Sequence, residues 1–232
     1  MKTIGLIGGM SWESTVGYYQ MINQEVKQRL GGLNSAKILL NSVNFAPIEK
    51  LQHEGDWQKT AEILSDAAKS LERGGADCVL ICTNTMHKVA EVVQESISIP
   101  LIHIADATGE ELVEHGVKKV GLLGTAFTME QSFYKGRLQD KFSLDVIVPN
   151  ESQRKVVHEV IYQELCLGEV KAESKAAYLE IVDALKEQGA EGIILGCTEI
   201  GLLISGKDTD VKLYDTVAIH AKAAVDWALA DD

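Results

Sequence analysis

Residues 75–85 read Gly-Ala-Asp-Cys-Val-Leu-Ile-Cys-Thr-Asn-Thr, and residues 189–199 read Gly-Ala-Glu-Gly-Ile-Ile-Leu-Gly-Cys-Thr-Glu. The two stretches align without a gap at an offset of 114 residues (189 − 75). Each is a short apolar run followed by small polar residues, which is typical of a buried strand and the loop after it. The same structural unit is therefore expected twice in this chain.

The sequence around these stretches repeats as well. Ile4-Gly5-Leu6-Ile7-Gly8 aligns with Val120-Gly121-Leu122-Leu123-Gly124 at an offset of 116, and residues 99–102 align with residues 211–214 at an offset of 112. Self-similarity at a nearly constant offset is the signature of a duplicated unit. We therefore predict two similar lobes.

Short β-branched segments alternate with longer segments of helical periodicity along the chain. The expected strands are 3–8, 37–43, 78–82, 101–104, 119–124, 144–148, 192–196 and 212–214. The expected helices are 13–29, 57–73, 86–96, 107–115, 129–142, 151–166, 173–187 and 216–230. This alternation predicts an α/β fold with two similar doubly wound parallel sheets, one in each lobe.

The repeat also predicts the domain limits. We expect an N-terminal lobe at 1–103, completed by a closing helix at 216–232, and a C-terminal lobe at 104–215. Ligands of open α/β sheets bind outside the carboxyl ends of the strands. We therefore predict an active site in the cleft between the lobes, the alternative being a duplicated sheet without a site.

Composition excludes several classes of protein. With 232 residues and 46% hydrophobic content, the chain can bury a core and is neither disordered nor fibrous. Its 22 basic and 34 acidic residues leave a net charge of −12, which disfavours nucleic acid as a partner. No apolar stretch approaches the ~20 residues of a membrane helix, and the N-terminus lacks a signal-peptide cleavage site. We expect a cytoplasmic protein whose four cysteines are thiols.

Cys197 is the strongest candidate for a reactive side chain. It follows an apolar strand and lies between Gly196 and Thr198, so backbone N–H groups and a hydroxyl can reach a bound carboxylate. A thiolate at this position can accept a proton or act as a nucleophile. The alternative is a buried core cysteine.

The repeat pairs Cys197 with Thr83, because 83 + 114 = 197. Cys82 is one residue away, and successive side chains of a strand point to opposite faces, so we expect Cys82 and Cys78 to fill the core. A threonine hydroxyl binds hydrogen-bond partners but is a weak acid. The two equivalent loops are therefore expected to differ in chemistry.

Asn84 and Thr85 precede the helix that begins at Met86 and His87. Their side chains and the helical N–H groups form a candidate carboxylate cradle, the alternative being an ordinary cap and turn. His87 either orients the site or caps the helix. After the first strand, the glycines at 8 and 9 permit close approach of the backbone to a ligand, with Thr125 at the matching end of the other lobe.

Three cofactor sites are excluded. The glycines of the first strand do not form G-x-G-x-x-G, and no acidic residue follows at the end of 37–43, which argues against a nicotinamide cofactor. The sequence also lacks the G-x-x-x-x-G-K-[ST] motif of a phosphate-binding loop. Cys78, Cys82 and His87 do not form a metal site, because the two cysteines belong to a buried strand.

The sequences Gly-Gly-Met-Ser-Trp at 8–12, Thr-Asn-Thr-Met-His at 83–87 and Gly-Cys-Thr-Glu at 196–199, with the repeat, resemble the aspartate/glutamate racemase superfamily over essentially the whole chain. The chain looks most similar to the aspartate racemase branch. The resemblance implies a homodimeric enzyme without a cofactor or a metal, in which two thiols act on opposite faces of an amino acid. It implies that Cys197 acts on the L-enantiomer. The family's first motif is Cys-Asn-Thr, and here Thr83 replaces that cysteine.

The resemblance also implies substrate contacts, which are Met10, Ser11, Gln52, Asn84, Thr85, Thr125, Thr198 and Glu199. It suggests that residues 44–57 form a long loop serving as a lid. Aspartate racemases can carry a lysine near 161–168 for the side-chain carboxylate, where this chain has Cys166; Lys50 is a candidate substitute.

We therefore predict a racemase of an L-amino acid, L-aspartate or L-glutamate, with Cys197 as the base and Thr83, directly or through a water, on the other face. Because Thr83 is a poor acid, isotope exchange is expected to be faster than inversion. The alternatives are a broad-specificity amino-acid racemase, a single-cysteine lyase or decarboxylase of the same fold, and an amino-acid-binding protein with weak or no turnover.

Overall fold

The computed structural model describes residues 1–230, and the chain folds into two compact units. Unit 1 consists of Met1–Ile104 and His220–Asp232, and unit 2 consists of Ala105–Ile219. Each unit contains one parallel sheet covered by helices. The predicted α/β fold class is confirmed.

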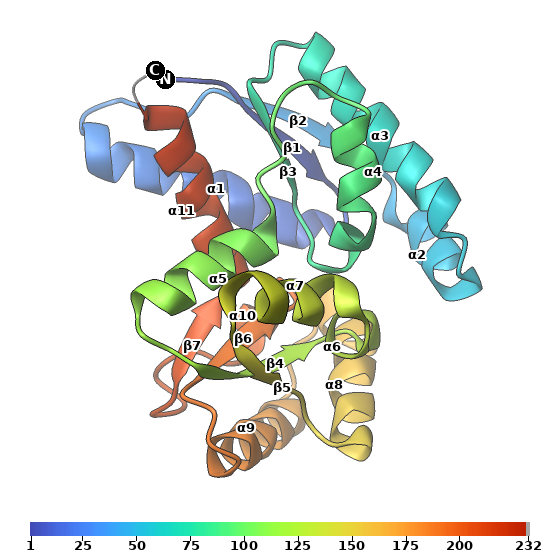
Figure 1. Ribbon diagram of the computed structural model, residues 1–232, viewed down its shortest axis with the longest axis vertical. Coiled ribbons are helices and arrows are strands. Elements are labelled where there is room, and N and C mark those ends of the chain that lie inside the picture. Colours follow the sequence, from blue (N-terminus) through green and yellow to red (C-terminus); the bar gives the residue numbers. More distant parts are fainter. Residues whose placement is uncertain (231–232) are drawn as a thin grey trace. The chain divides into compact units, whose positions relative to one another are not determined.

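Unit 1 has a three-stranded parallel sheet of order β2-β1-β3. Its elements in chain order are β1 (Ile4–Gly8), α1 (Trp12–Leu30), β2 (Ile38–Ser42), α2 (Phe45–Glu54), α3 (Trp57–Arg73), β3 (Cys78–Ile81), the 3-10 helix η1 (Thr85–Val89), α4 (Ala90–Glu95) and most of α11 (Thr216–Leu229). Figure 1 shows α1 and α11 on one face of this sheet and α3 and α4 on the other. Residues 231–232, the end of the predicted closing helix 216–232, lie outside the described residues.

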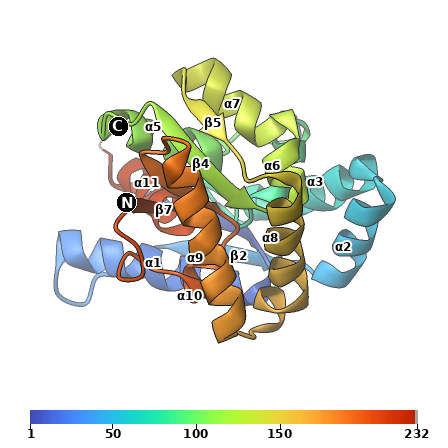
Figure 2. The same ribbon diagram turned by 90° about the horizontal axis from the view of Figure 1, so that it is seen from below.

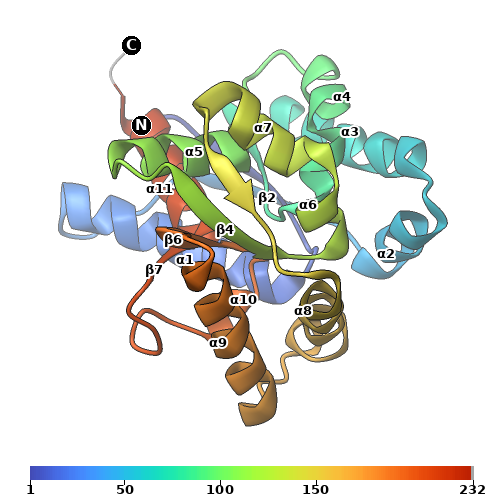
Figure 3. The ribbon, with the colours of Figure 1, turned by 60° about the horizontal axis from the view of Figure 1, so that its bottom comes forward.

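Unit 2 has a four-stranded parallel sheet of order β5-β4-β6-β7. Its elements are α5 (Ile104–Glu114), β4 (Lys119–Gly124), α6 (Ala126–Glu130), α7 (Ser132–Phe142), β5 (Asp145–Ile147), α8 (Glu151–Gln163), the 3-10 helix η2 (Leu165–Leu167), α9 (Ala172–Glu187), β6 (Gly192–Gly196), α10 (Ile200–Leu203) and β7 (Lys212–Asp215). Helices α8 and α9 pack side by side (Figure 2). Figure 3 shows α5 and α7 on one face of the sheet and α8 and α9 on the other.

The predicted repeat is present in the pairing register of the two sheets. Strands β1, β2 and β3 occupy the positions of β4, β5 and β6, and the parallel bridge of Leu101 occupies the position of β7. The equivalent pairs are Ile4–Cys78 with Val120–Gly192, and Val79–Leu101 with Ile193–Leu213. The offsets in the sequence therefore correspond to equivalent places in two sheets.

Helix α3 illustrates how the sequence builds each layer. The Asp56 side chain caps its first turn by accepting a hydrogen bond from the Lys59 N–H at 3.0 Å. Its buried apolar side chains include Ala61, Leu64, Ala68 and Leu71, which are spaced three and four residues apart. This spacing places them on one face of the helix, against the sheet. Burial of Leu64 alone stabilises the fold by about 1.5–3 kcal/mol.

The predicted strand 101–104 is wrong. Only Leu101 bridges the sheet, and Ile104 begins α5. Pro100 has no N–H to donate to a ladder. The side chain of Gln94 binds the backbone on either side of this proline, through the Ile99 carbonyl at 3.0 Å and the Leu101 N–H at 2.7 Å. The segment is therefore a single bridge held by a side chain. The other seven predicted strands are present, with ends within one residue.

The predicted lid loop at 44–57 is also wrong, because most of this segment is helix α2. Pro47 lies in its first turn, where the missing N–H removes no helical hydrogen bond. Gly55 ends the helix in the left-handed conformation (φ 76°). The buried residues Ile48 and Gln52 are one turn apart on the inner face. A packed helix thus occupies the segment expected to be a mobile loop.

Three predicted helices are interrupted, and α10 was not predicted. The segment 129–142 is divided by Gln131, whose backbone is extended (φ −94°, ψ 154°). The segments 86–96 and 151–166 each combine an α-helix with a 3-10 turn. Apolar periodicity does not reveal such breaks, because a 3-10 turn keeps nearly the same buried face. None of the helices in residues 1–230 combines the length and apolar character of a membrane span.

Candidate active site

Strand β6 ends in a close backbone approach to β4, and Cys197 follows directly. A Cβ atom on Gly196 would lie 2.7 Å from the Leu123 carbonyl oxygen, and one on Gly124 would lie 2.9 Å from the Gly196 oxygen. Both positions therefore require glycine. This close packing fixes where the chain leaves the sheet and thus the position of Cys197, which is only 9% exposed.

The Cys197 thiol is hydrogen-bonded to the carboxylate of Glu199. The Sγ atom donates to Glu199 Oε2 at 2.9 Å, and the Thr198 hydroxyl donates to the same oxygen at 2.7 Å. Glu199 is 3% exposed. Three consecutive residues that the sequence placed at the site therefore form one buried hydrogen-bonded group.

Burial raises the pKa of the Cys197 thiol well above its usual value. The negative charge of Glu199 and the nearby Cys166 raise this pKa further. A second anion beside a buried carboxylate is unfavourable because little water is present to screen the two charges. Cys197 therefore rests as a thiol that donates to Glu199.

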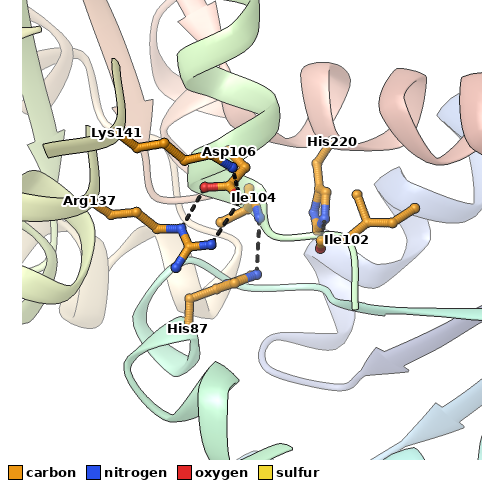
Figure 4. A network of polar contacts seen from close by, with 7 residues as sticks. All are labelled: His87, Ile102, Ile104, Asp106, Arg137, Lys141 and His220. Atoms are coloured by element: carbon orange, nitrogen blue, oxygen red, sulfur yellow. Dashed lines mark hydrogen bonds and ion pairs between the residues drawn. The ribbon is translucent and has the colours of Figure 1, made fainter. Parts of the chain in front are cut away.

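In unit 1, Thr83 follows β3 and is half-buried. Its carbonyl oxygen is 2.8 Å from His87 Nδ1, and the Ile104 N–H donates to His87 Nε2 at 3.2 Å (Figure 4). A carbonyl only accepts and a backbone N–H only donates. His87 is therefore a neutral imidazole with its proton on Nδ1. It holds the backbone of Thr83, which corrects the expectation that it might only cap a helix.

The chain around His87 contains further buried histidines that sequence reasoning missed. His103 lies 4.5 Å from His87 between ring centroids, and His220 lies 5.8 Å from it. His220 is 2.8 Å from the Tyr18 hydroxyl through Nδ1 and 2.7 Å from the Ile102 carbonyl through Nε2 (Figure 4). Burial lowers the pKa of His220 to about 4. The sequence contained one sign of this cluster, which is the position of His220 within the otherwise largely apolar helix α11.

Asn84 and Thr85 are buried beside Thr83, at 1% and 6% exposure. The Asn84 side chain makes no capping bond to η1; the His87 N–H donates instead to the backbone carbonyl of Asn84 at 3.0 Å. The capping alternative is therefore wrong for this side chain. Asn84 and Thr85 remain candidates for substrate binding.

Cys78 and Cys82 are completely buried in unit 1, as predicted. Burial raises the pKa of Cys78 to about 12 and also raises the pKa of Cys82. Both are inert core thiols at rest. In residues 1–230, no three His, Cys, Asp or Glu side chains gather as metal ligands.

The loop after β1 is organised by Thr15, another residue that the sequence did not single out. The Gly9 N–H donates to Thr15 Oγ1 at 2.8 Å, and this hydroxyl donates to the Ser11 carbonyl at 2.8 Å. The side chain of Ser11 caps α1 by accepting from the Ser14 N–H. Met10 and Ser11 are buried and joined by a cis peptide bond. The predicted contacts Met10 and Ser11 therefore belong to an ordered turn.

Thr125 occupies the matching place in unit 2, after β4. Its Oγ1 caps α6 by accepting from the Thr128 N–H at 3.3 Å. It is 4% exposed. The loops after β1 and β4 are thus both followed by a helix with a hydroxyl cap.

Gln52 reaches the loop after β3 from α2. It is 2% exposed, and its Nε2 donates to Met86 Sδ at 2.9 Å. Lys50, the proposed substitute for a carboxylate-binding lysine, has an exposed side chain paired with Glu54 at 3.7 Å. Cys166 lies in η2 and is partly exposed.

The predicted residues are divided between the two units, where they follow the carboxyl ends of the strands, except that Gln52 reaches the loop after β3 from α2. The group in unit 1 is Met10, Ser11, Gln52, Thr83, Asn84 and Thr85. The group in unit 2 is Thr125, Cys197, Thr198 and Glu199. A thiol, a carboxylate and several buried hydroxyl or amide groups can bind a small polar molecule and move a proton.

Comparisons with a family model and with solved structures both relate this chain to racemases. Residues 7–224 match the family model described as Asp/Glu/Hydantoin racemase. A crystal structure of a candidate Asp/Glu racemase from Yersinia pestis is 54% identical, covers 99% of this chain and 100% of the other, and superposes with a TM-score of 0.93. An aspartate racemase homologue from Pyrococcus horikoshii OT3 is 36% identical, with 99% and 100% coverage and a TM-score of 0.84.

Among curated proteins, the broad specificity amino-acid racemase RacX of Bacillus subtilis (strain 168) is 23% identical over 98% of each chain. The family match spans nearly all of the two units. The chain therefore belongs to the Asp/Glu/hydantoin racemase family, a family of isomerases.

Proposed function

We propose that this protein is a cofactor-independent racemase of L-aspartate or L-glutamate in which the Cys197 thiolate removes the α-proton. The observation that carries the proposal is the buried thiol at the end of β6, hydrogen-bonded to a carboxylate at 2.9 Å. Hydroxyl and amide groups at the strand ends supply hydrogen bonds for the substrate carboxylate.

The reaction proceeds in two proton transfers. The Cα–H bond breaks, its proton forms an S–H bond on Cys197, and the electron pair remains as a carbanion delocalised into the carboxylate. A proton supplied by Thr83, directly or through a water, then bonds to the opposite face of Cα. Solvent restores the proton of Thr83, and Cys197 releases the proton it took from Cα to solvent, which regenerates the thiolate. Because a hydroxyl is a much weaker acid than a thiol, return of a proton from Cys197 competes effectively, and exchange is faster than inversion.

We propose the remaining predicted contacts as the groups that bind the substrate's carboxylate and amino groups: Met10, Ser11, Gln52, Asn84, Thr85, Thr125, Thr198 and Glu199. The similarity to the broad specificity racemase RacX and to the aspartate racemase homologue from Pyrococcus horikoshii OT3 supports an amino-acid substrate for this chain. We also propose a homodimer, for which sedimentation equilibrium at twice the mass of the chain is the test.

The decisive experiment incubates L-aspartate and D-aspartate separately with the protein in D₂O. NMR follows loss of the α-proton, and chiral chromatography follows enantiomer content. Exchange from the L side that is faster than inversion is the expected result. Equal exchange from both enantiomers would contradict the assignment of Cys197 as the single working base.

Broad substrate specificity is the second candidate function, favoured by the match to RacX over 98% of each chain. A panel of L-amino acids in the same D₂O assay distinguishes acidic specificity from broad specificity. Exchange confined to aspartate and glutamate supports the acidic specificity, and exchange across apolar and basic amino acids supports the broad one. Release of CO₂ from a malonate-type acid without amino-acid exchange would replace both by the lyase alternative.

A further inference from the structure

Four large apolar side chains are exposed together on one side of unit 1. Trp12, Val16 and Tyr19 of α1 are 65%, 44% and 56% exposed, and Leu40 of β2 is 51% exposed. The three residues of α1 are spaced four and three positions apart, which places them in one row along the helix. These four residues are called the α1/β2 face. The proposed reaction uses none of them.

Two contacts place β2 beside this row of α1. The side chain of Asn23, further along the same row, accepts a hydrogen bond from the Ala36 N–H at 3.0 Å, just before β2 begins. A Cβ atom on Gly8 would lie 2.4 Å from Thr15 Cγ2 and 2.9 Å from Leu40 Cδ1. Leu40 therefore lies on the α1 side of the sheet, and the four side chains belong to one surface of unit 1.

This surface is uncharged. Neither 14–24 nor 38–48 contains a charged residue, although 24% of the chain is charged. By contrast, the exposed Val92 of α4 lies close in the sequence to Glu91 and Glu95. Single exposed apolar residues are ordinary on a protein surface, whereas the centres of protein interfaces are poor in charge and rich in tryptophan and tyrosine. The α1/β2 face therefore has the composition of an interface.

Strand β2 is also at the edge of its sheet. Hydrogen bonds join the backbone of Lys37 and of Val43 to β1, at N···O distances of 2.9 Å and 3.0 Å. Alternate residues of such a strand bond to the same neighbour, so the backbone groups of Ile38, Leu40 and Ser42 point away from β1. On that side β2 has no neighbouring strand within residues 1–230. An edge of this kind binds another strand unless charge or proline protects it, and 38–43 contains neither.

We propose that a second copy of this chain covers the α1/β2 face, with the two β2 strands paired antiparallel across a two-fold axis. This inference rests on the proposed homodimer and not on the proposed reaction. An axis perpendicular to the sheet joins the same edge of both copies and keeps both α1 helices on one side of the joined sheet. The apolar rows of the two helices then lie next to each other, and the backbone groups at the two edges bond to one another.

Charge identifies the occupant as a second copy. Each chain carries a net charge of −12, so two copies repel one another. An uncharged face lets them meet without placing like charges together, a contact that would cost several kcal/mol. A basic partner protein, in contrast, would find no carboxylate to pair with in 14–24 or 38–48.

The first test compares two equivalent substitutions by sedimentation velocity over a range of protein concentrations. Val16→Asp introduces a carboxylate into the face of each copy, and we expect the dimer dissociation constant to rise at least about 100-fold. Val92→Asp is the matched control, because Val92 has nearly the same exposure, 45%, on another helix of unit 1. It should leave the dissociation constant unchanged.

The second test uses the unaltered chain, so it does not depend on the folding of a variant. Hydrogen exchange with mass spectrometry is measured above and below the dissociation constant. Peptides covering 38–43 should exchange more slowly in the concentrated sample, because the outer edge of β2 is then bonded. A peptide covering α4 should not respond to dilution. Peptides of β1 and β3 report in the same experiment whether Val16→Asp remains folded.

Each failure has its own signature. Equal dissociation constants for Val16→Asp and Val92→Asp would overturn the α1/β2 face and leave the homodimer. A monomeric unaltered chain would overturn both. Protection of α1 without protection of 38–43 would overturn the pairing of the two β2 strands. Absence of turnover with every amino acid would overturn only the proposed function.

Discussion

The loops after β3 and β6 occupy equivalent positions in two sheets of the same strand order, yet they carry different chemistry. In unit 2, Cys197 donates to the carboxylate of Glu199. In unit 1, the equivalent Thr83 has its carbonyl bound by the neutral ring of His87. The comparison teaches that duplication preserves the backbone position of a loop, while the side chains decide what that loop can do.

Unit 1 does contain a thiol one residue away, in the core directly after β3. Cys82 stands at the position of Gly196, since 82 + 114 = 196. It is completely buried, and the loss of hydration raises its pKa. A shift of one residue at a strand end thus separates a core cysteine from the cysteine that we propose as the base.

The substitution with the largest expected effect tests whether the loops after β3 and β6 differ in chemistry. Replacement Cys197→Ser should reduce α-proton exchange from L-aspartate by about 10³-fold or more, because a hydroxyl is a much weaker acid than a thiol and forms the anionic base far less readily. The measurement is the NMR exchange rate in D₂O. Cys82→Ala is the matched control in unit 1 and should retain exchange; a folded Cys82→Ala protein without exchange would move the base to unit 1.

The second prediction uses the buried histidines to separate the stabilities of the two units. The folded-state pKa of His220, about 4, lies below its ordinary value of 6.5. The unfolded chain therefore binds a proton that the folded chain does not. This contribution to stability is complete above pH 6.5 and is lost as the pH falls towards 4, at a cost of about 3 kcal/mol.

Hydrogen exchange with mass spectrometry at pH 7 and pH 4.5, corrected for intrinsic rates, checks this difference. Peptides of unit 1 should lose protection in acid before those of unit 2. His220→Gln should flatten the pH dependence in unit 1, whereas His115→Gln, at a partly exposed position of unit 2, should leave it unchanged. Simultaneous loss in both units would argue against His220 as the cause.

The third prediction concerns a substitution that makes the loops after β3 and β6 chemically alike. Thr83→Cys places a thiol at the position equivalent to Cys197, and a thiol is a much stronger acid than a hydroxyl. We expect inversion to accelerate about tenfold relative to exchange, and exchange from D-aspartate to appear. Thr83→Val, which has a similar shape but no hydroxyl, should slow inversion further. An unchanged ratio in both variants would exclude Thr83 from the proton-transfer step.

The smallest expected effect concerns a polar cluster within unit 2. Asp106 of α5 accepts hydrogen bonds from Arg137 and from Lys141 of α7 (Figure 4). Burial acts to raise the pKa of Asp106, but these two cations lower it below its ordinary value. Asp106→Asn should therefore destabilise unit 2 by about 1 kcal/mol at pH 7. The stabilisation belongs to the ionised carboxylate, so it is lost as the pH falls below about 4.

Urea denaturation at pH 7 measures this change, with unit 2 followed by hydrogen exchange. Asp140→Asn on the exposed surface of α7 is the control and should change stability by less than about 0.5 kcal/mol. Equal effects of the two substitutions would show that the cluster contributes nothing specific.

Much of the fold followed from local patterns in the sequence. Of the eight strands predicted from the apolar runs and the repeat, seven are present, and the offsets of 116 and 114 correspond to the pairing of Ile4 with Cys78 and of Val120 with Gly192. Such patterns are readable because burial of a strand requires a continuous apolar run and the loop after it requires small or polar residues. The lid loop expected at 44–57 from the family resemblance is wrong, because this segment forms α2, with Pro47 in its first turn and Gly55 as its C-cap.

By itself, the sequence determined that the chain contains two equivalent α/β halves and that Cys197, Thr83 and their neighbours follow equivalent strands. Only the tertiary structure decided which groups meet. The hydrogen bonds of Glu199 to Cys197, of His87 to Ile104 and of Gln52 to Met86 depend on side-chain directions and on contacts between distant elements. Periodicity reports which face of an element is buried, but the partner of a buried polar group is chosen by packing, because burial makes an unpaired group costly.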